Sequence, residues 1–347
     1  MPRNRSVLRN WAEYLPARAI ASLLQCFPVE QNLATAAWGG RMYYRLSAKR
    51  RLRAICNIQD AFPDWSRECC DDVARRSVEN MFQLAGVDAL AMPRLVTPDR
   101  WPEFVDLGDA QHQVRRMMGD RSTLFITGHC GNWEMLGYSI SVVGYPMAAL
   151  ARPLDNPLLN GWLLGLRQAY GLRILTKWGA TPEMQKIIKA NEPIGFIADQ
   201  NAGDNGIFVP FFGRLASTYK SIGLLAMKYE LPLVVTMAER INGGFKYRIN
   251  VQDVIEPEEW ADQPDPLYYI TARYIHGIEQ MVRRAPEQYL WMHRRWKSRP
   301  RHERQGQDMP QMLEEQIRSL PWLSTDECEA VIDRSNQESK LNRKTAQ

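Results

Sequence analysis

The sequence predicts an α/β fold with a mostly parallel central sheet flanked by helices, preceded by an N-terminal helical extension that associates with a membrane. Three observations favour this class. From Arg121 onward, apolar β-branched runs alternate with helical segments of about ten to fifteen residues, as in strands joined by crossover helices. Residues 7 to about 90 instead repeat apolar side chains at three- and four-residue steps, the period of helices. The 347 residues, 45% of them hydrophobic, are enough to bury a large core.

Two breaks divide the helical N-terminal region. One lies near Pro28 and the other around Phe62-Pro63-Asp64, where proline and turn-forming residues interrupt the helical period. Ser66 is expected to cap the next helix, which reaches about Ala85, and Gly86 is expected to close it. We therefore assign residues 1–90 to a basic, amphipathic, helical N-terminal part.

The second region, residues 91–304, contains the alternating elements and is assigned as an α/β domain. Its last two strands are expected to form a hairpin through Asn242-Gly243-Gly244, and residues 200–216 are expected to form a loop. Residues 305–347 are polar and are expected to form a C-terminal tail that ends in disorder. The predicted strands are 122–127, 146–151, 172–176, 194–198, 232–239 and 245–251; the predicted helices start at Asn132, Asn156, Pro182, residue 218 and Pro266.

One stretch, residues 123–137, organises the candidate site. Leu124 to Thr127 has the composition of a buried strand, and Asn132 has the character of a helix cap. On one continuous helix, residues five apart point about 140° away from each other, whereas at a strand–loop–helix corner they can meet. We therefore expect His129 in the loop, with one imidazole nitrogen held by Glu134 and the other free as a general base. The alternative is a core histidine that only satisfies a turn.

Two further polar positions follow predicted strands, as catalytic loops in parallel sheets do. Arg152 ends one strand and is placed to pair with a phosphate or carboxylate, although a surface ion pair is the alternative. Asp199 ends another, where an unpaired carboxylate is costly, so it either pairs with a base such as Arg152 or caps a turn. Cys130 offers a rival nucleophile beside His129, but adjacent residues usually point to different sides.

The aromatic residues between Gly206 and Arg214 have two interpretations. Phe208, Phe211 and Phe212 line an acyl-chain groove or a membrane-facing lip in one of them, and pack in the core in the other. The sequence pattern favours neither.

The charge is concentrated at the N-terminus. Residues 1–60 contain ten Lys or Arg and three acids, hence +7, which leaves −2 for the rest of a chain with net charge +5. Aromatic and apolar residues interleave with these bases, which suits an anionic lipid surface; a solvated helical face is the alternative. We expect no nucleic-acid partner because no binding motif accompanies the charge.

A membrane-spanning segment is not expected. The best apolar stretch, Tyr14 to Phe27, is interrupted by Pro16, Arg18 and Gln25 and is too short to cross a bilayer. This favours peripheral or shallowly inserted attachment. The six cysteines occur without a Cys-x-x-Cys pair, so no metal site and no disulfide framework is predicted, which fits a reducing compartment.

Four ordered blocks carry a family resemblance. The segment Gly128-His129-Cys130-Gly131-Asn132-Trp133-Glu134 resembles the His-x4-acid signature of the lysophospholipid acyltransferase superfamily, in particular the bacterial lipid A biosynthesis (lauroyl/myristoyl) acyltransferases. The resemblance covers roughly residues 10 to 300. Three further stretches match in order: residues 151–157, residues 198–200 together with 206–214, and residues 290–297.

The resemblance implies an acyltransferase for groups other than aminoacyl groups. It would move a fatty acyl group from an acyl-carrier-protein or coenzyme A thioester to a hydroxyl of a membrane glycolipid used in lipopolysaccharide, at the cytoplasmic face of the inner membrane and without a resident cofactor. His129 and Glu134 would be catalytic, and substrate would be bound by Asn132, Arg152, Asp199, Gln200 and Arg214. The alternatives are another lysophospholipid-like or glycolipid acceptor, a lipid hydrolase using the same His/Glu pair, and a non-catalytic lipid-binding protein.

Overall fold

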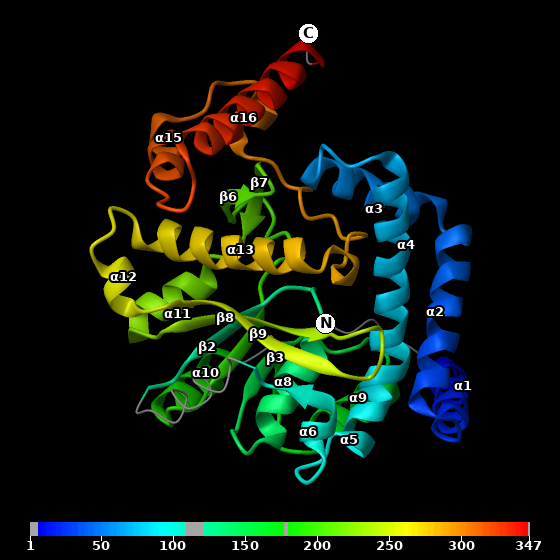
Figure 1. Ribbon diagram of the computed structural model, residues 1–347. Coiled ribbons are helices and arrows are strands. Elements are labelled where there is room, and N and C mark those ends of the chain that lie inside the picture. The colour runs from blue at the N-terminus through cyan, green and yellow to red at the C-terminus, as the bar shows by residue number, and fades with distance from the viewer. Residues whose placement is uncertain (1–5, 109–120, 177–179, 346–347) are drawn as a thin grey trace.

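The computed structural model describes residues 6–108, 121–176 and 180–345, and its centre is a seven-stranded sheet (Figure 1). The strands that carry the site run parallel to their neighbours, and only β9 is antiparallel to β8. The predicted mostly parallel sheet is therefore confirmed. Across the sheet the order is β1 (Val105–Asp106), β9 (Tyr247–Ile255), β8 (Leu233–Arg240), β2 (Leu124–Thr127), β5 (Ile194–Ile197), β3 (Ala148–Ala151) and β4 (Arg173–Thr176).

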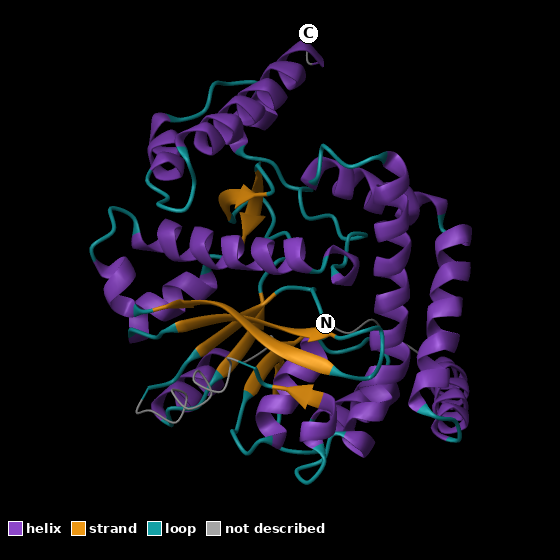
Figure 2. Ribbon diagram, in the orientation of Figure 1, coloured by secondary structure: helices purple, strands orange, loops and turns teal. Residues whose placement is uncertain are grey.

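Helices cover both faces of the sheet, as the fully buried strand β2 requires (Figure 2). One hydrophobic core contains the side chains of β2 that face α10, α11 and α13, and a second contains those that face α5 and α8. The predicted flanking helices are thus present. Their bounds are α5 (Ala89–Leu95), α6 (Trp101–Phe104), α8 (Trp133–Val142), α9 (Pro157–Arg167), α10 (Ala180–Lys189), α11 (Ser221–Tyr229), α12 (Pro257–Ala261) and α13 (Pro266–Arg284).

The N-terminal region is helical, as predicted. Ser66 caps α4 by accepting a hydrogen bond from the Cys69 amide at 3.2 Å. Gly86 does not end this helix, because a closing glycine adopts positive φ and Gly86 does not; the chain continues through a π-helix into α5. Side chains of α2, α3 and α4 belong to the same core as β2 and α13, so these helices pack within the main body. The bounds are α1 (Val7–Gln25), α2 (Val29–Leu46), α3 (Ala48–Ala61), α4 (Arg67–Gln83) and η1 (Leu84–Asp88).

The predicted loop at 200–216 contains a β-hairpin instead. β6 (Ile207–Phe211) pairs antiparallel with β7 (Arg214–Thr218). Phe212 and Gly213, with φ of 52° and 64°, form the two-residue turn, the geometry that a tight hairpin prefers. Phe211 and Phe212 are buried in the main core, so the core interpretation holds for these two, whereas Phe208 is partly buried against the smaller core of the C-terminal helices.

The C-terminal region also differs from the expected tail, because it forms helices that pack on the hairpin (Figure 1). Ile317, Val331 and Ile332 join Leu215 of β7 in a small separate core. These apolar residues are spread thinly among charged ones, which is why the sequence reads as polar. The elements are η2 (Pro286–Gln288), α14 (Arg301–Gln305), α15 (Gln311–Arg318) and α16 (Thr325–Thr345).

Candidate active site

The predicted strand–loop–helix corner lies at the carboxyl end of β2. Asn132 caps α8 by accepting a hydrogen bond from the Met135 amide at 2.9 Å, as the sequence indicated. Gly131 adopts φ of +59°, and a Cβ atom there would lie 2.3 Å from the carbonyl oxygen of Ala238. Only glycine fits this turn, so the loop that carries His129 packs directly against the end of β8.

His129 is paired with Asp199. The Nδ1 atom of His129 lies 2.7 Å from Oδ1 of Asp199, and the side chains are 16% and 1% exposed. The pairing follows from the register of the sheet, in which Thr127 of β2 is opposite Ile197 of β5. Each partner comes two residues after one of these paired positions, so both emerge at the same point of the carboxyl edge.

Electrostatics in this pair favour the protonated imidazole. Burial by itself lowers the pKa of His129, but the charge and hydrogen bond of Asp199 outweigh it, and the pKa is raised above its ordinary value. Burial by itself raises the pKa of Asp199, but His129 outweighs it, and this pKa is lowered. Asp199 is therefore an ionised partner that stabilises an imidazolium, the species a general base forms during a reaction.

The other imidazole nitrogen faces Gln200. With Nδ1–H donating to Asp199, the Nε2 atom of His129 accepts from the side-chain amide of Gln200 at 3.1 Å. Both His129 and Gln200 line a cavity, so a hydroxyl group that enters it can replace the Gln200 amide as the hydrogen-bond partner of Nε2.

The prediction that Glu134 holds the imidazole is wrong in this structure. The carboxylate of Glu134 forms a two-pronged ion pair with Arg167 of α9, with Arg167 Nε at 2.7 Å from Oε2. Asp199, which follows the neighbouring strand β5, takes the place beside Nδ1. Glu134 still lines the same cavity and contributes a smaller raising effect to the pKa of His129.

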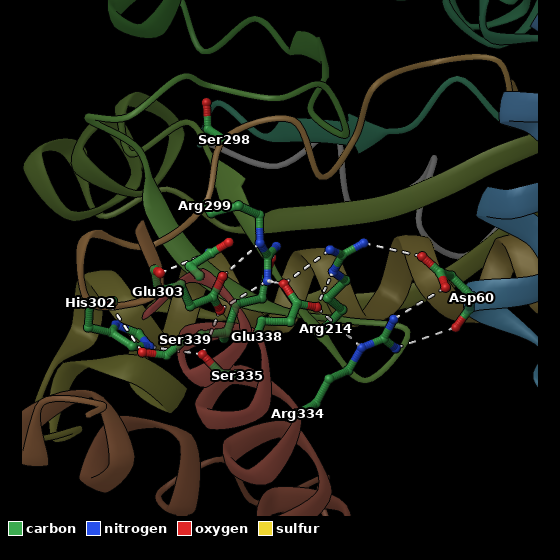
Figure 3. A network of polar contacts seen from close by, with 12 residues as sticks. Asp60, Arg214, Ser298, Arg299, His302, Glu303, Arg334, Ser335, Glu338 and Ser339 are labelled. Carbon is green, nitrogen blue, oxygen red and sulfur yellow. Dashed lines mark hydrogen bonds and ion pairs between the residues drawn. The ribbon is translucent and has the colours of Figure 1, made fainter. Parts of the chain in front are cut away.

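Two predicted substrate-binding residues lie away from the cavity surface. Asn132 is 1% exposed, and its side-chain amide donates to Asp88 at 2.8 Å, so it has no surface to offer a substrate. Arg214 forms ion pairs with Asp60 and Glu338, which join the hairpin to α3 and to α16 (Figure 3). Both predictions were attached to motif positions whose role here is structural.

Arg152 lies where the sequence placed it, after β3. It is exposed and lines the cavity, and among residues 6–108, 121–176 and 180–345 no acid forms an ion pair with it. It pairs neither with Asp199 nor with another carboxylate described there, so the surface-ion-pair alternative finds no support. This leaves a cation at the cavity entrance.

Cys130 is completely buried. Burial, with the charge of Asp199, raises the pKa of its thiol to about 12. A thiol with such a pKa has almost no thiolate at neutral pH, and thiolate is the nucleophilic form. The structure therefore disfavours the rival mechanism through an acyl-cysteine.

A second imidazole lies close to the first and was not singled out by the sequence. The rings of His293 and His129 are nearly parallel, at 7°, with centroids 6.5 Å apart. Burial lowers the pKa of His293, with His129 adding to this effect and Asp199 opposing it. The signal for it was available, since His293 stands in the last of the four resembling blocks.

The cavity, of about 340 Å³, lies between the sheet and helices α8 and α9. Four laterally paired residues, one from each of β2, β5, β3 and β4, form a row across the sheet that lines the cavity; we call this row the rung. The central two have almost no side chain, which hollows the sheet at this point. From the carboxyl edge the cavity continues to Met147 and Leu172, which precede β3 and β4. The rung consists of Phe125, Gly195, Ala149 and Ile174.

A buried His–Asp pair beside an apolar cavity is an arrangement that an enzyme can use for general-base catalysis on an apolar substrate. A family model described as bacterial lipid A biosynthesis acyltransferase matches residues 2–298. The chain belongs to this family and is an acyltransferase.

Curated relatives agree with the family model. The chain is 25% identical over 301 residues to a lipid A biosynthesis lauroyltransferase of Escherichia coli, covering 84% of this chain and 93% of that protein. It is 27% identical over 270 residues to a lipid A biosynthesis palmitoleoyltransferase of Escherichia coli, covering 75% and 83%. A lipid A biosynthesis acyltransferase of Haemophilus influenzae is 24% identical over 249 residues, covering 70% and 74%.

Proposed function

We propose that this chain transfers a fatty acyl group from an acyl-carrier-protein or coenzyme A thioester to a hydroxyl group of a membrane glycolipid of the lipid A type. The observation that carries the proposal is the His129–Asp199 pair at the mouth of the apolar cavity. Membership of the family and the names of the relatives support the choice of acceptor.

In the proposed reaction, Nε2 of His129 takes the proton of the acceptor hydroxyl while its oxygen attacks the thioester carbonyl carbon. The new C–O bond forms, the C–S bond breaks, and the imidazolium returns the proton to the departing thiolate. Asp199 keeps the proton of the neutral ring on Nδ1 and stabilises the imidazolium. Transfer is direct, which agrees with the raised pKa of Cys130.

The cavity and Arg152 suit different parts of the substrates. The cavity wall is largely apolar and runs along the sheet from His129 to Met147, which suits the fatty acyl chain of the donor. Arg152 at the entrance suits an anionic group, such as a phosphate of the acceptor or the donor, since its planar guanidinium binds phosphate with two hydrogen bonds.

Helix α1 is the proposed membrane contact. Leu8, Leu15 and Leu23 follow one side of this helix at seven- and eight-residue steps, and their exposed fractions are 81%, 56% and 61%. Trp11 beside them is 45% exposed. In the described part of the chain no helix is both long and apolar enough to span a bilayer. An exposed apolar side with a tryptophan suits shallow insertion at the lipid interface.

The same helix is tied to the cavity entrance. Asn156, which caps α9, donates from its side-chain amide to the backbone oxygen of Asn10 at 3.0 Å. Arg18 of α1 lies over the ring of Trp162, 4.9 Å from its centroid. Leu154, between Arg152 and this cap, is 45% exposed and lines the cavity. A membrane in contact with α1 would therefore lie beside the entrance, where a lipid acceptor needs to arrive.

Incubation with a labelled acyl thioester tests this function. With a lipid A precursor in vesicles, the label should move to the lipid, and without acceptor it should stay on the donor. Release of free fatty acid at the same rate with or without acceptor would instead assign a hydrolase that uses His129 to activate water. Absence of both reactions would assign a lipid-binding role.

A further inference from the structure

A fully buried ion pair lies behind the loop that carries His129. The side chains of Asp88 and Arg240 are 0% and 4% exposed, and Nη2 of Arg240 donates to Oδ2 of Asp88. Asp88 is the last residue of the π-helix between α4 and α5, and π-helical turns occur often at functional sites. Neither side chain lines the cavity, so neither can touch substrate.

Arg240 also donates two hydrogen bonds outside the pair, and its guanidinium lies over the ring of Tyr247, 5.0 Å from the centroid. Its Nη1 donates to the carbonyl oxygen of Gly244 at 3.0 Å, and its Nε donates to the side-chain oxygen of Asn80 at 3.3 Å. Burying two ions costs desolvation energy that hydrophobic residues of similar size would not incur. This cost suggests that the pair does something besides stabilising the fold.

The carboxylate of Asp88 reaches the active-site corner through one residue. Oδ2 of Asp88 accepts from the side-chain amide of Asn132 at 2.8 Å, while the side-chain oxygen of Asn132 caps α8. The backbone amide of Asn132 donates to the carbonyl oxygen of Ala238 at 2.7 Å. Asn132 is thus fixed on three sides, and His129 lies three residues before it.

Arg240 reaches the same loop from the other direction. The side-chain amide of Gln288 binds both backbone groups of Arg240, at 2.9 and 3.1 Å. The backbone oxygen of Gln288 accepts from the amide of Gly131 at 3.0 Å, and the amide of Leu290 donates to the backbone oxygen of His129 at 3.0 Å. Asp88 therefore connects to Asn132 through its side chain, while Arg240 connects through its backbone and Gln288 to Gly131.

We propose that Asp88 and Arg240 are positioning residues, which hold the loop 129–132 through Asn132 and Gln288 so that His129 meets Asp199 in reactive geometry. The inference rests on the proposed role of His129 as general base. A displacement of about 1 Å in a catalytic group can cost about a hundredfold in rate, so loosening this clamp should lower turnover even in a folded protein.

Two variants weaken the link at different points. Asp88→Asn removes the charge, and Asn132→Ser keeps a helix cap on α8, because serine caps as well as asparagine, but is too short to reach Asp88. Each should lower kcat about ten- to hundredfold, with the KM for the acyl donor changed less than about threefold. Because both substitutions disrupt the same Asp88–Asn132 connection, kcat of the double variant should be little lower than kcat of the less active single variant.

Glu303→Gln is the matched control. Glu303 of α14 is 0% exposed and pairs with Arg299 at 2.8 Å, in a network that also contains Glu338 of α16 (Figure 3). This variant should lower the Tm as a buried-pair variant does, yet keep kcat at a temperature where it is folded.

A readout independent of activity separates this inference from the proposed function. The low-field NMR signal of the proton between His129 and Asp199 should be lost or shifted in Asp88→Asn and Asn132→Ser, and retained in Glu303→Gln. If Asp88→Asn does not fold, Asn132→Ser decides alone. Folded variants with wild-type kcat and an unchanged signal would overturn the inference, as would a loss of Tm only, like that of Glu303→Gln.

Discussion

Oδ1 of Asp199 lies 2.7 Å from Nδ1 of His129, although seventy residues separate them in the chain. This contact replaces the expected one between His129 and Glu134, which are five residues apart. It makes the candidate base depend on a residue that follows the neighbouring strand β5, and it changes which substitution should disturb proton transfer most.

Asp199→Asn should lower kcat about 10²- to 10⁴-fold, because the imidazolium loses its ionised partner. The pH profile gives a second signature. The base is active when neutral, so kcat/KM should fall as the pH drops through the raised pKa of His129. Without the charge of Asp199, burial lowers that pKa, and the acidic limb should move to lower pH. A profile of kcat/KM against pH with an unmoved limb would argue against the pair.

Glu134→Gln should lower turnover without moving the acidic limb as Asp199→Asn does, because Glu134 pairs with Arg167 and adds only a smaller effect to the pKa of His129. Arg167→Gln should behave similarly, since it breaks the same ion pair. Steady-state kinetics across the pH range checks both variants. A limb displaced further by Glu134→Gln than by Asp199→Asn would restore Glu134 as the partner of the imidazole.

Ala149→Leu should shorten the acyl chains that the enzyme accepts. Ala149 is in the middle of the hollow rung, opposite Gly195 and Ile174, and a larger side chain would close the cavity there. We expect kcat/KM to fall about tenfold or more for long-chain donors, which is a loss of about 1.4 kcal/mol or more in buried apolar contact, and to change little for short ones. A series of acyl donors of increasing length measures this, and a uniform loss across the series would place the chain elsewhere.

Leu8→Asp combined with Leu15→Asp should weaken binding to anionic vesicles about tenfold or more, because both side chains are on the exposed apolar side of α1. Deletion of residues 1–55 is a poorer test, since α2 and α3 belong to the main core. Vesicle flotation at rising salt is the measurement. Met312→Asp, at an exposed position of α15, is the control for added negative charge. If the Leu8→Asp/Leu15→Asp variant and the Met312→Asp control bind vesicles equally well, the membrane contact lies on another surface.

The sequence was sufficient for the parallel sheet, the asparagine caps of α8 and α9, and the loop position of His129, because these depend on short-range patterns. It missed the Asp199 partner because that contact depends on strand order and register, which place Thr127 opposite Ile197 and which local patterns do not encode. Arg214 and the C-terminal helices were misjudged for a related reason. The partners of Arg214, Asp60 and Glu338, come from opposite ends of the chain, and Glu338 belongs to the C-terminal helix α16.

The most direct test of the general-base role is single-turnover acyl transfer by His129→Ala, with circular dichroism to confirm folding. We expect the rate to fall about 10²- to 10⁴-fold, while Cys130→Ser, assayed beside it, stays close to wild type because its thiol is buried and protonated. A folded His129→Ala protein with a near-normal rate would contradict the mechanism, and so would an acyl group trapped on Cys130 of the wild type.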